Sequence, residues 1–448
     1  MGIKEYIFSK IIELPNFINY RLMLFNRYPN YIFGEKYVKY KNNLKNNTIK
    51  KDELRLLELV NYSLKHVKYY KDKYPSLQIN SIEEFQKKVN FIDKDMVMED
   101  TSVFLSDEID MNKFIKGTTG GTSGKPLQLI IPKNRHIVEL GTVHYYWEQY
   151  GYNFTPRAVL RNKKIKNKSF IINPITKEVI FDGFSLKDQN FKIIYNTMKK
   201  YKIEFLQCYP SSGYAFAKYL KNNKLDVSFI KSFFVSSENL LEYQKEFILS
   251  LGIKLFSLYG HSEKLVIAGT CAYCGYYHFE SSYGYMELVD SNNNLITDEG
   301  ILGEIVGTSF NNYGMPLVRY KTGDYAEYVD IECECGFKGK SVKTIAGRWN
   351  GDKVYNIDGT YVTTTALNLH NELYSVIDGI QYIQKEKGNL SINIIEGHNF
   401  TKDDENKIVE HFKNKLASDS IITLSKVKTL LKQKNGKFLL LISGVKHD

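Results

Sequence analysis

The chain has few cysteines and tryptophans and no long hydrophobic run. It has five cysteines and two tryptophans in 448 residues, which argues against a disulfide scaffold in a chain of this length. No apolar stretch approaches the ~18 residues that a membrane-spanning helix needs. The opening stretch, MGIKEYIFSKIIEL, lacks the pattern of a secretion signal. We therefore expect a cytoplasmic protein without a transmembrane segment.

Lysine and arginine outnumber aspartate and glutamate, which gives the chain a formal net charge of +11. Such a charge suits nucleic acid, an anionic membrane surface or an anionic small substrate. The lysines are scattered among acids and the densest run, at 161–168, is short, which favours a solvated surface. The sequence contains no motif that reads DNA or RNA. Nucleic acid is therefore not an expected partner.

The start of the chain has the spacing of an amphipathic helix. Ile3, Ile7, Ile11 and Leu14 fall on one helical face. We expect that face to pack against the body of the protein. A peripheral contact with a membrane surface or a partner is the alternative, and a homodimer is left open.

The chain is expected to contain regions of different secondary structure. Residues 1–100 are expected to be mostly helical, since 52–74 has apolar residues at helical spacing. Residues 203–260 read as strand, helix, strand, helix, strand, which predicts a parallel α/β sheet. Short strands with turn residues predict an antiparallel portion over 281–346. The residues after 352 predict a small α+β module.

A glycine-rich loop, KGTTGGTSGKP at 116–126, lies between these regions and precedes a predicted strand at 127–131. It does not match the G-x-x-x-x-G-K-[ST] phosphate loop. Thr119 occupies the position of the first glycine, and Pro126 replaces the Mg²⁺-binding hydroxyl. Its glycines and hydroxyls still suit close approach to phosphate oxygens.

Three further motifs follow the loop: SLYGHSEK at 257–264, MPLVRYKTGD at 315–324 and IAGR at 345–348. In this order and spacing the four motifs resemble the adenylate-forming superfamily, which contains acyl-CoA synthetases, luciferases and peptide-synthetase adenylation domains. The MPLVRYKTGD form is similar to the phenylacetate–CoA ligase branch, and closer still to the ligase-like proteins of capsular polysaccharide loci.

The resemblance implies an α/β fold with two domains. The large N-terminal adenylation domain would span 1–347, with parallel α/β sheets and an antiparallel β portion at about 265–346. A small mobile α+β domain would span 348–448, with a hinge near 347–352. The usual hinge reads GRxDD, whereas this chain has GRWNGD. That departure puts the second half-reaction in question.

The resemblance also implies a nucleotide site. The loop would grip the departing pyrophosphate, Glu263 would hold Mg²⁺, and Asp324 would accept the ribose hydroxyls. Tyr259 would stack on adenine beside Gly260, while Ser236, Ser237 and Glu238 resemble the loop lining the pocket, although an N-cap explains them equally well. The pyrophosphate-gripping residues would be Thr118, Thr119, Gly120, Gly121, Thr122, Ser123 and Lys125.

Lys437, in the sequence NGKF, matches the mobile-domain lysine that bridges the carboxylate and the α-phosphate. Lys432 and Lys434 lie close in sequence and leave the choice of lysine open. Arg348 marks the hinge.

Four of the five cysteines form two close pairs, Cys271-x-x-Cys274 and Cys333-x-Cys335. Four thiolates at this spacing suit a structural Zn²⁺. His278 is an alternative ligand, or lies near the substrate pocket. The less favoured alternative is that the cysteines are free and buried.

The sequence therefore predicts an AMP-forming ligase that uses ATP, Mg²⁺, structural Zn²⁺ and CoA. It would join a carboxylic acid to AMP and pass the acyl group to CoA. Transfer to an amine or a sugar-linked group in surface polysaccharide synthesis is the alternative. A zinc-containing binding protein without activity, or a relative that binds nucleotide without turnover, are less favoured hypotheses.

Overall fold

A computed structural model describes most of the chain. The described residues are 10–26, 32–46, 52–118, 127–160, 165, 168–183, 186–347, 353–359, 361–363, 367, 369, 373, 376–432 and 439–445. Within them, no helix is long and apolar enough to cross a membrane.

The N-terminal region is helical, as predicted. The expected helix over 52–74 is divided at Val67, which forms an isolated β-bridge with Ser106. Side-chain oxygens of Ser81 and Asp93 cap the helices that follow them, each accepting from a backbone N–H three residues on. The helices are α2 (Asn16–Phe25), α4 (Glu35–Lys45), α5 (Asp52–His66), α6 (Lys68–Lys73), α7 (Ile82–Lys88) and α8 (Lys94–Glu99), with 3-10 turns at Thr101–Phe104 and Met111–Lys113.

The N-terminal apolar face was expected to pack against the body of the protein, and Leu14 does not do so. This side chain is 37% exposed, because the chain turns at Pro15 and α2 contacts the body through other residues. Ile11 is half-buried, and Ile3 and Ile7 lie outside the described residues.

One sheet of 13 strands forms the centre of the molecule, in the order β12-β11-β13-β14-β15-β10-β9-β8-β7-β6-β3-β5-β4. The strands are β3 (Arg157–Leu160), β4 (Phe170–Asn173), β5 (Glu178–Phe181), β6 (Phe205–Cys208), β7 (Ser232–Ser236), β8 (Lys254–Gly260), β9 (Ile267–Thr270), β10 (Tyr277–Phe279), β11 (Gly284–Val289), β12 (Leu295–Ile296), β13 (Leu302–Ser309), β14 (Tyr320–Tyr328) and β15 (Ser341–Ala346). A separate hairpin pairs β1 (Phe114–Thr118) with β2 (Gln128–Pro132).

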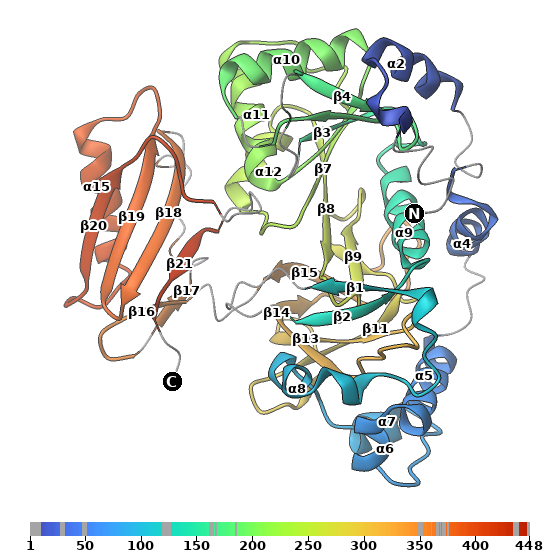
Figure 1. Ribbon diagram of the computed structural model, residues 1–448. Coiled ribbons are helices and arrows are strands. Elements are labelled where there is room, and N and C mark those ends of the chain that lie inside the picture. Colours follow the sequence, from blue (N-terminus) through green and yellow to red (C-terminus); the bar gives the residue numbers. More distant parts are fainter. Residues whose placement is uncertain are drawn as a thin grey trace.

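The sheet changes character at β8. On one side, β5, β3, β6, β7 and β8 are parallel. The intervening helices are α9 (Arg135–Glu148), α10 (Asp188–Lys200), α11 (Pro210–Asn222) and α12 (Glu242–Leu249). On the other side, β8 to β15 pair antiparallel. The predicted parallel and antiparallel portions are therefore present, and they join in one continuous sheet (Figure 1).

The C-terminal part forms its own small sheet, in the order β20-β19-β18-β21. Its elements are β16 (Lys353–Tyr355), β17 (Tyr361–Thr363), β18 (Ile377–Glu386), β19 (Asn389–Glu396), α15 (Lys402–Lys413), β20 (Ile421–Lys426) and β21 (Leu441–Ser443). A turn at Asp358-Gly359 lies between β16 and β17, and Gly359 has a φ of 85°, which glycine adopts without strain. The predicted α+β module is therefore present.

The C-terminal part contacts α11 and α12 of the large domain (Figure 1). The Lys218 ammonium on α11 forms a salt bridge with Asp378 and donates to the Ile377 carbonyl at 3.1 Å. Tyr243 on α12 packs against the C-terminal apolar cluster. The predicted domain boundary at 347/348 meets a segment outside the described residues and stays a prediction.

Arg319, in the MPLVRYKTGD motif, ties the N-terminal helices to the sheet. Its guanidinium binds both carboxylate oxygens of Glu287 on β11, at 3.1 and 3.0 Å, and donates to the carbonyls of Gln86 and Val89 at 2.8 and 2.7 Å. Both charged side chains are buried. Removal of one partner would leave the other as an uncompensated buried charge.

We expect Arg319→Ala to destabilise the large domain by roughly 3–5 kcal/mol, because Glu287 would lose its buried counter-ion. The matched control is Lys245→Ala, which removes the cation of an exposed pair with Glu242 and should cost less than about 1 kcal/mol. Urea unfolding followed by circular dichroism measures both. Equal effects of the two changes would contradict this role of Arg319.

Candidate functional site

Several of the predicted nucleotide-site residues lie where the parallel strands end. Strand β7 ends at Ser236, and Ser236 pairs with Leu258 of the parallel strand β8. The residues that follow, Ser237 and Tyr259, therefore lie at the same edge of the sheet. The carboxyl edge of parallel strands is where open α/β sheets bind ligands. Ser237 has a φ of 70°, which turns the chain sharply after β7.

Tyr259 and Asp324 are joined directly. The Tyr259 hydroxyl donates to Asp324 Oδ2 at 2.9 Å. Burial, followed by the negative charge of Asp324, raises the pKa of Tyr259 well above its usual value. The phenol therefore stays protonated and holds the carboxylate in place. The Asp324 backbone N–H donates to Thr322 Oγ1 at 3.1 Å, which closes the TGD turn.

Gly347, in the IAGR motif, lies beside both elements. Its N–H donates to Asn239 Oδ1 at 3.3 Å. A Cβ at this position would lie 2.9 Å from Asn239 Oδ1 and 3.5 Å from Asp324 Oδ1, so there is little room for a side chain. The structure thus brings together VSSENL, YGHSEK, TGD and IAG, which are far apart in the sequence.

Glu238 has a local structural role. Its Oε2 accepts from the backbone N–H of Ser211 at 3.1 Å, in the first turn of α11. An acceptor at a helix N-terminus satisfies an amide that has no partner within the helix. Glu238 also acts on Lys432 of the C-terminal part, because its carboxylate partly offsets the lowering of the Lys432 pKa by burial. Lys432 therefore lies near this edge of the sheet.

Glu263 and His261 occupy the turn after β8. Glu263 Oε1 accepts from the Tyr320 hydroxyl at 3.4 Å. The His261 ring stacks on Tyr259 with centroids 5.8 Å apart. Both His261 ring nitrogens are buried and have no hydrogen-bond partner within the described residues. Buried polar atoms in this state are costly unless a ligand or water satisfies them, so His261 joins the candidate site.

Several predicted site residues lie outside the described residues. Thr118 ends β1 and pairs with Gln128 of β2, so the glycine loop begins and ends at the same hairpin. The remaining loop residues, 119–126, together with Arg348, Lys434 and Lys437, are not described. Their roles stay predictions.

The cysteines form a second cluster. Cys271 and Cys274 follow β9, and the two other cysteines come from the loop between β14 and β15. Cys271 Sγ and Cys333 Sγ are 3.5 Å apart. Four sulfurs at ~2.3 Å from one Zn²⁺ lie about 3.8 Å apart. The observed spacing is therefore close to that of tetrahedral thiolate ligands.

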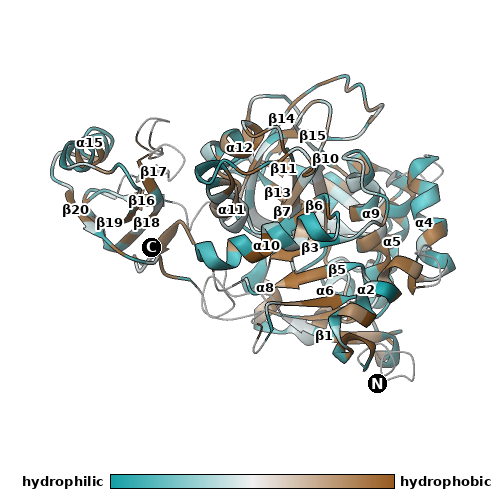
Figure 2. Ribbon diagram, turned by 90° about the horizontal axis from the view of Figure 1, so that it is seen from above, coloured by the Kyte–Doolittle hydropathy of each residue, from teal (hydrophilic) through white to brown (hydrophobic). Residues whose placement is uncertain are grey.

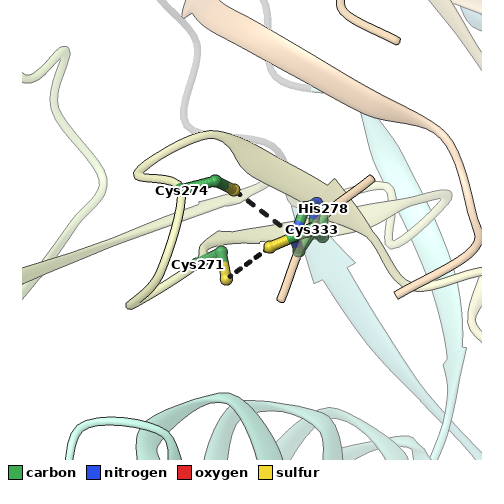
Figure 3. Close-up of side chains that lie close together, drawn as sticks. All are labelled: Cys271, Cys274, His278 and Cys333. Atoms are coloured by element: carbon green, nitrogen blue, oxygen red, sulfur yellow. Dashed lines mark hydrogen bonds between the residues drawn. The ribbon is translucent and has the colours of Figure 1, made fainter. Parts of the chain in front are cut away.

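His278 of β10 joins this cluster. Its Nε2 lies 3.7 Å from Cys274 Sγ and 3.5 Å from Cys335 Sγ, and its Nδ1 lies 2.8 Å from Ser341 Oγ. Cys271, Cys274, His278 and Cys333 offer ligand atoms within 4.8 Å of one another and point toward a common centre (Figure 3). The predicted set of four cysteines thus gains an imidazole as a fifth candidate donor.

Sequence reasoning did not assign His261 to the site. The signal available was its position inside YGHSEK, between two residues with proposed roles. A lone histidine in a turn is uninformative until its burial and its unsatisfied nitrogens are known.

Comparison with known proteins identifies the fold. Residues 354–444 match the family model described as the CapK C-terminal domain. The chain is 22% identical to protein CapK of Staphylococcus aureus over 389 residues, which cover 81% of each chain.

Two solved structures are also similar. One is 2-hydroxyisobutyryl-CoA ligase in the postadenylation state in complex with R3-HIB-AMP (TM-score 0.66, 14% identity, 87% of this chain and 88% of that chain). In its thioesterification state the same ligase matches with a TM-score of 0.53, at 15% identity and the same coverage. The other is the amide bond synthetase McbA of Marinactinospora thermotolerans (TM-score 0.50, 11% identity, 73% of this chain and 68% of that chain).

The resemblance expected from the motifs is confirmed: the chain has the fold of the adenylate-forming ligases, and its residues 354–444 form a CapK-type C-terminal domain.

Proposed function

We propose that the chain is an ATP-dependent carboxylic acid ligase. In the first step, a carboxylate oxygen of the substrate attacks the α-phosphorus of ATP. The bond from that phosphorus to the oxygen bridging to the β-phosphate breaks, and pyrophosphate leaves. The acyl-adenylate then loses AMP when a nucleophile attacks its acyl carbon. Because two anions must meet, positioning and charge neutralisation supply most of the catalysis.

The observation that carries this proposal is the convergence of Tyr259, Asp324 and Gly347 at the carboxyl edge of β7 and β8. Asp324 has a fixed carboxylate that can accept from the two ribose hydroxyls. Tyr259 and His261 form a stacked aromatic pair beside it, suited to the face of adenine. The small Gly347 leaves room for the nucleotide, and the orphan nitrogens of His261 gain a ligand partner.

Magnesium fits the turn after β8. A hard cation requires oxygen ligands, and Glu263 supplies a carboxylate that accepts a 3.4 Å hydrogen bond from the Tyr320 hydroxyl. Bound Mg²⁺ would neutralise charge on the phosphates. The undescribed residues Thr119–Lys125 would hold the departing pyrophosphate.

A lysine of the C-terminal part completes the site in this proposal. Lys437 keeps its assignment from the NGKF motif, with Lys432 as the competing residue because it lies near Glu238. The higher similarity to the postadenylation state than to the thioesterification state of the same ligase, with TM-scores of 0.66 and 0.53, supports a domain placement suited to the first step.

The acceptor of the acyl group is CoA in the favoured form of the proposal. The fold is shared with a CoA ligase and also with an amide bond synthetase. An amine or sugar-linked acceptor in capsular polysaccharide synthesis is therefore the second candidate, supported by the CapK-type domain. Either reaction would take place in the cytoplasm.

The test is carboxylate-dependent exchange of labelled pyrophosphate into ATP. Aryl acids, fatty acids, amino acids and uronic acids would each be supplied to the purified protein, with and without CoA. We expect exchange with one acid class, and thioester formation with that acid when CoA is present. No exchange with any class would contradict the proposal, whereas adenylate formation without a thioester would favour the amine or sugar acceptor.

The identity of the catalytic lysine can be tested directly. Lys437→Ala should lower pyrophosphate exchange by roughly 10²–10³-fold, the scale for one preorganised charge donor. Lys428→Ala, on an exposed residue of the same domain, is the matched control and should leave exchange unchanged. A large loss in Lys432→Ala, with none in Lys437→Ala, would move the role to Lys432.

Asp324 is expected to determine nucleotide affinity. Asp324→Ala removes the ribose acceptor, and loss of hydrogen bonds to a charged group should weaken ATP binding roughly 10- to 100-fold. Asp298→Ala changes an exposed carboxylate and is the control. Isothermal titration with ATP measures both affinities, and an unchanged affinity in Asp324→Ala would remove Asp324 from the site.

We further propose that the cysteine cluster holds a structural Zn²⁺. Bound metal would fix the loop between β14 and β15 against β9 and β10, since its ligands come from both. Structural zinc sites contribute directly to folding free energy. The donor set fits this ion, because thiolates and a neutral imidazole are its usual ligands.

Purified protein should contain one equivalent of zinc by mass spectrometry, and a strong chelator should lower the thermal unfolding midpoint. Cys271→Ser should reduce the zinc content severalfold, because one ligand is lost. Cys208→Ser is the matched control, since Cys208 is buried in β6 outside the cluster. Zinc far below one equivalent in the unaltered protein would be inconsistent with this site.

A further inference from the structure

Helix α2 is attached to the sheet through asparagine side chains. β4 is the last strand of the 13-stranded sheet. Asn16 Nδ2 donates to the Phe170 carbonyl at 2.9 Å, and its Oδ1 accepts from the Ile172 N–H at 3.2 Å. Asn19 Nδ2 donates to the Ile172 carbonyl at 3.1 Å. These side-chain amides thus satisfy backbone N–H and C=O groups at the open edge of β4, which would otherwise be unpaired there.

The same helix presents apolar side chains outward. Phe17 is 65% exposed and Phe25 is 83% exposed, and Leu14 and Leu24 are also exposed. Phe17, Arg21 and Leu24 follow one another at intervals of four and three residues and so lie on one face of α2, and Leu14 lies in the bend just before the helix. The helix thus buries Asn19 and Met23 on its inner side and also presents apolar side chains outward, whereas an ordinary surface helix turns its polar side to the solvent.

This concentration of exposed apolar residues is specific to one segment. Among the described residues, five of the 16 exposed large hydrophobic side chains lie within positions 14–25. Scattered exposed hydrophobic residues need no explanation, whereas a contiguous patch marks an interaction surface. In Figure 1, α2 lies on the outside of the molecule beside β4, and Figure 2 shows α2 at the periphery with brown segments.

The surroundings of this face are basic. Arg21 belongs to the apolar stripe, and Tyr20 of α2 contacts Tyr201, just after α10, with ring centroids 4.3 Å apart. Exposed cations flank that contact at Lys199, Lys200 and Lys202. The single acid within residues 10–26, Glu13, is paired with Lys10 at 2.9 Å.

We propose that the α2 face, defined by Phe17, Arg21, Leu24 and Phe25 together with Leu14 just before the helix, binds an anionic membrane surface. The aromatic and leucine side chains would enter the headgroup region, while Arg21 and the neighbouring lysines contact lipid phosphates. Charge complementarity selects this occupant. A second copy would bring the same cations to the contact, and the chain carries a net charge of +11. The inference does not depend on the proposed ligase activity.

Flotation with vesicles tests this proposal. The full chain should bind phosphatidylcholine vesicles that contain phosphatidylglycerol, and should bind pure phosphatidylcholine vesicles much less. Added salt should weaken the binding, because the lysine contacts are electrostatic. The double change Phe17→Ser with Phe25→Ser should reduce binding by about tenfold or more, since two large apolar side chains are lost.

The matched control is Leu249→Ser with Ile301→Ser, which removes two exposed apolar residues from other elements and should bind as the unaltered chain does. Equal thermal unfolding midpoints exclude misfolding as the cause. The proposal fails if the full chain does not bind anionic vesicles, or if the Phe17/Phe25 variant binds equally well. It also fails if binding requires removal of residues 1–9, or if the variant instead dissociates a dimer seen by sedimentation velocity.

Discussion

The hydrogen bond from the Tyr259 hydroxyl to Asp324 joins the two halves of the large sheet at the proposed site. Tyr259 ends the last parallel strand, and Asp324 lies in the antiparallel portion. Burial and the neighbouring carboxylate keep the phenol protonated, so the contact persists over the ordinary pH range. The IAGR and VSSENL segments reach the same place, where the Gly347 N–H donates to Asn239 Oδ1. Nucleotide recognition in our proposal depends on this geometry.

The antiparallel portion has two candidate anchors at separate points, the buried Arg319–Glu287 pair and, if it holds the proposed Zn²⁺, the partly buried cysteine cluster. The Arg319–Glu287 pair anchors the start of β14 to β11 and to the helices at residues 86–89. The cysteine cluster lies at the other end of β14, in the loop that leads to β15. Asp324 is between these two anchors, and β15 leads from the second anchor to Gly347. With the proposed Zn²⁺ bound, Asp324 would have rigid support on both sides, as a preorganised polar site requires.

Much of this architecture was predictable from local pattern. Strand and helix periods predicted the order β6-α11-β7-α12-β8, and the resemblance to the adenylate-forming superfamily implied that Tyr259 and Asp324 would serve one site. Tertiary properties were not predictable. The orphan nitrogens of His261 and the left-handed backbone of Arg319 depend on residues distant in sequence. The expectation for Leu14 failed because α2 is attached to the sheet edge through Asn16, Asn19 and the buried Met23.

The most direct test of the account is a crystal structure of the protein with a non-hydrolysable ATP analogue and Mg²⁺. The account predicts density for the nucleotide at the carboxyl edge of β7 and β8, with the ribose hydroxyls on Asp324 and the adenine beside Tyr259 and His261. An empty edge at saturating analogue, or a nucleotide bound away from Asp324, would contradict it.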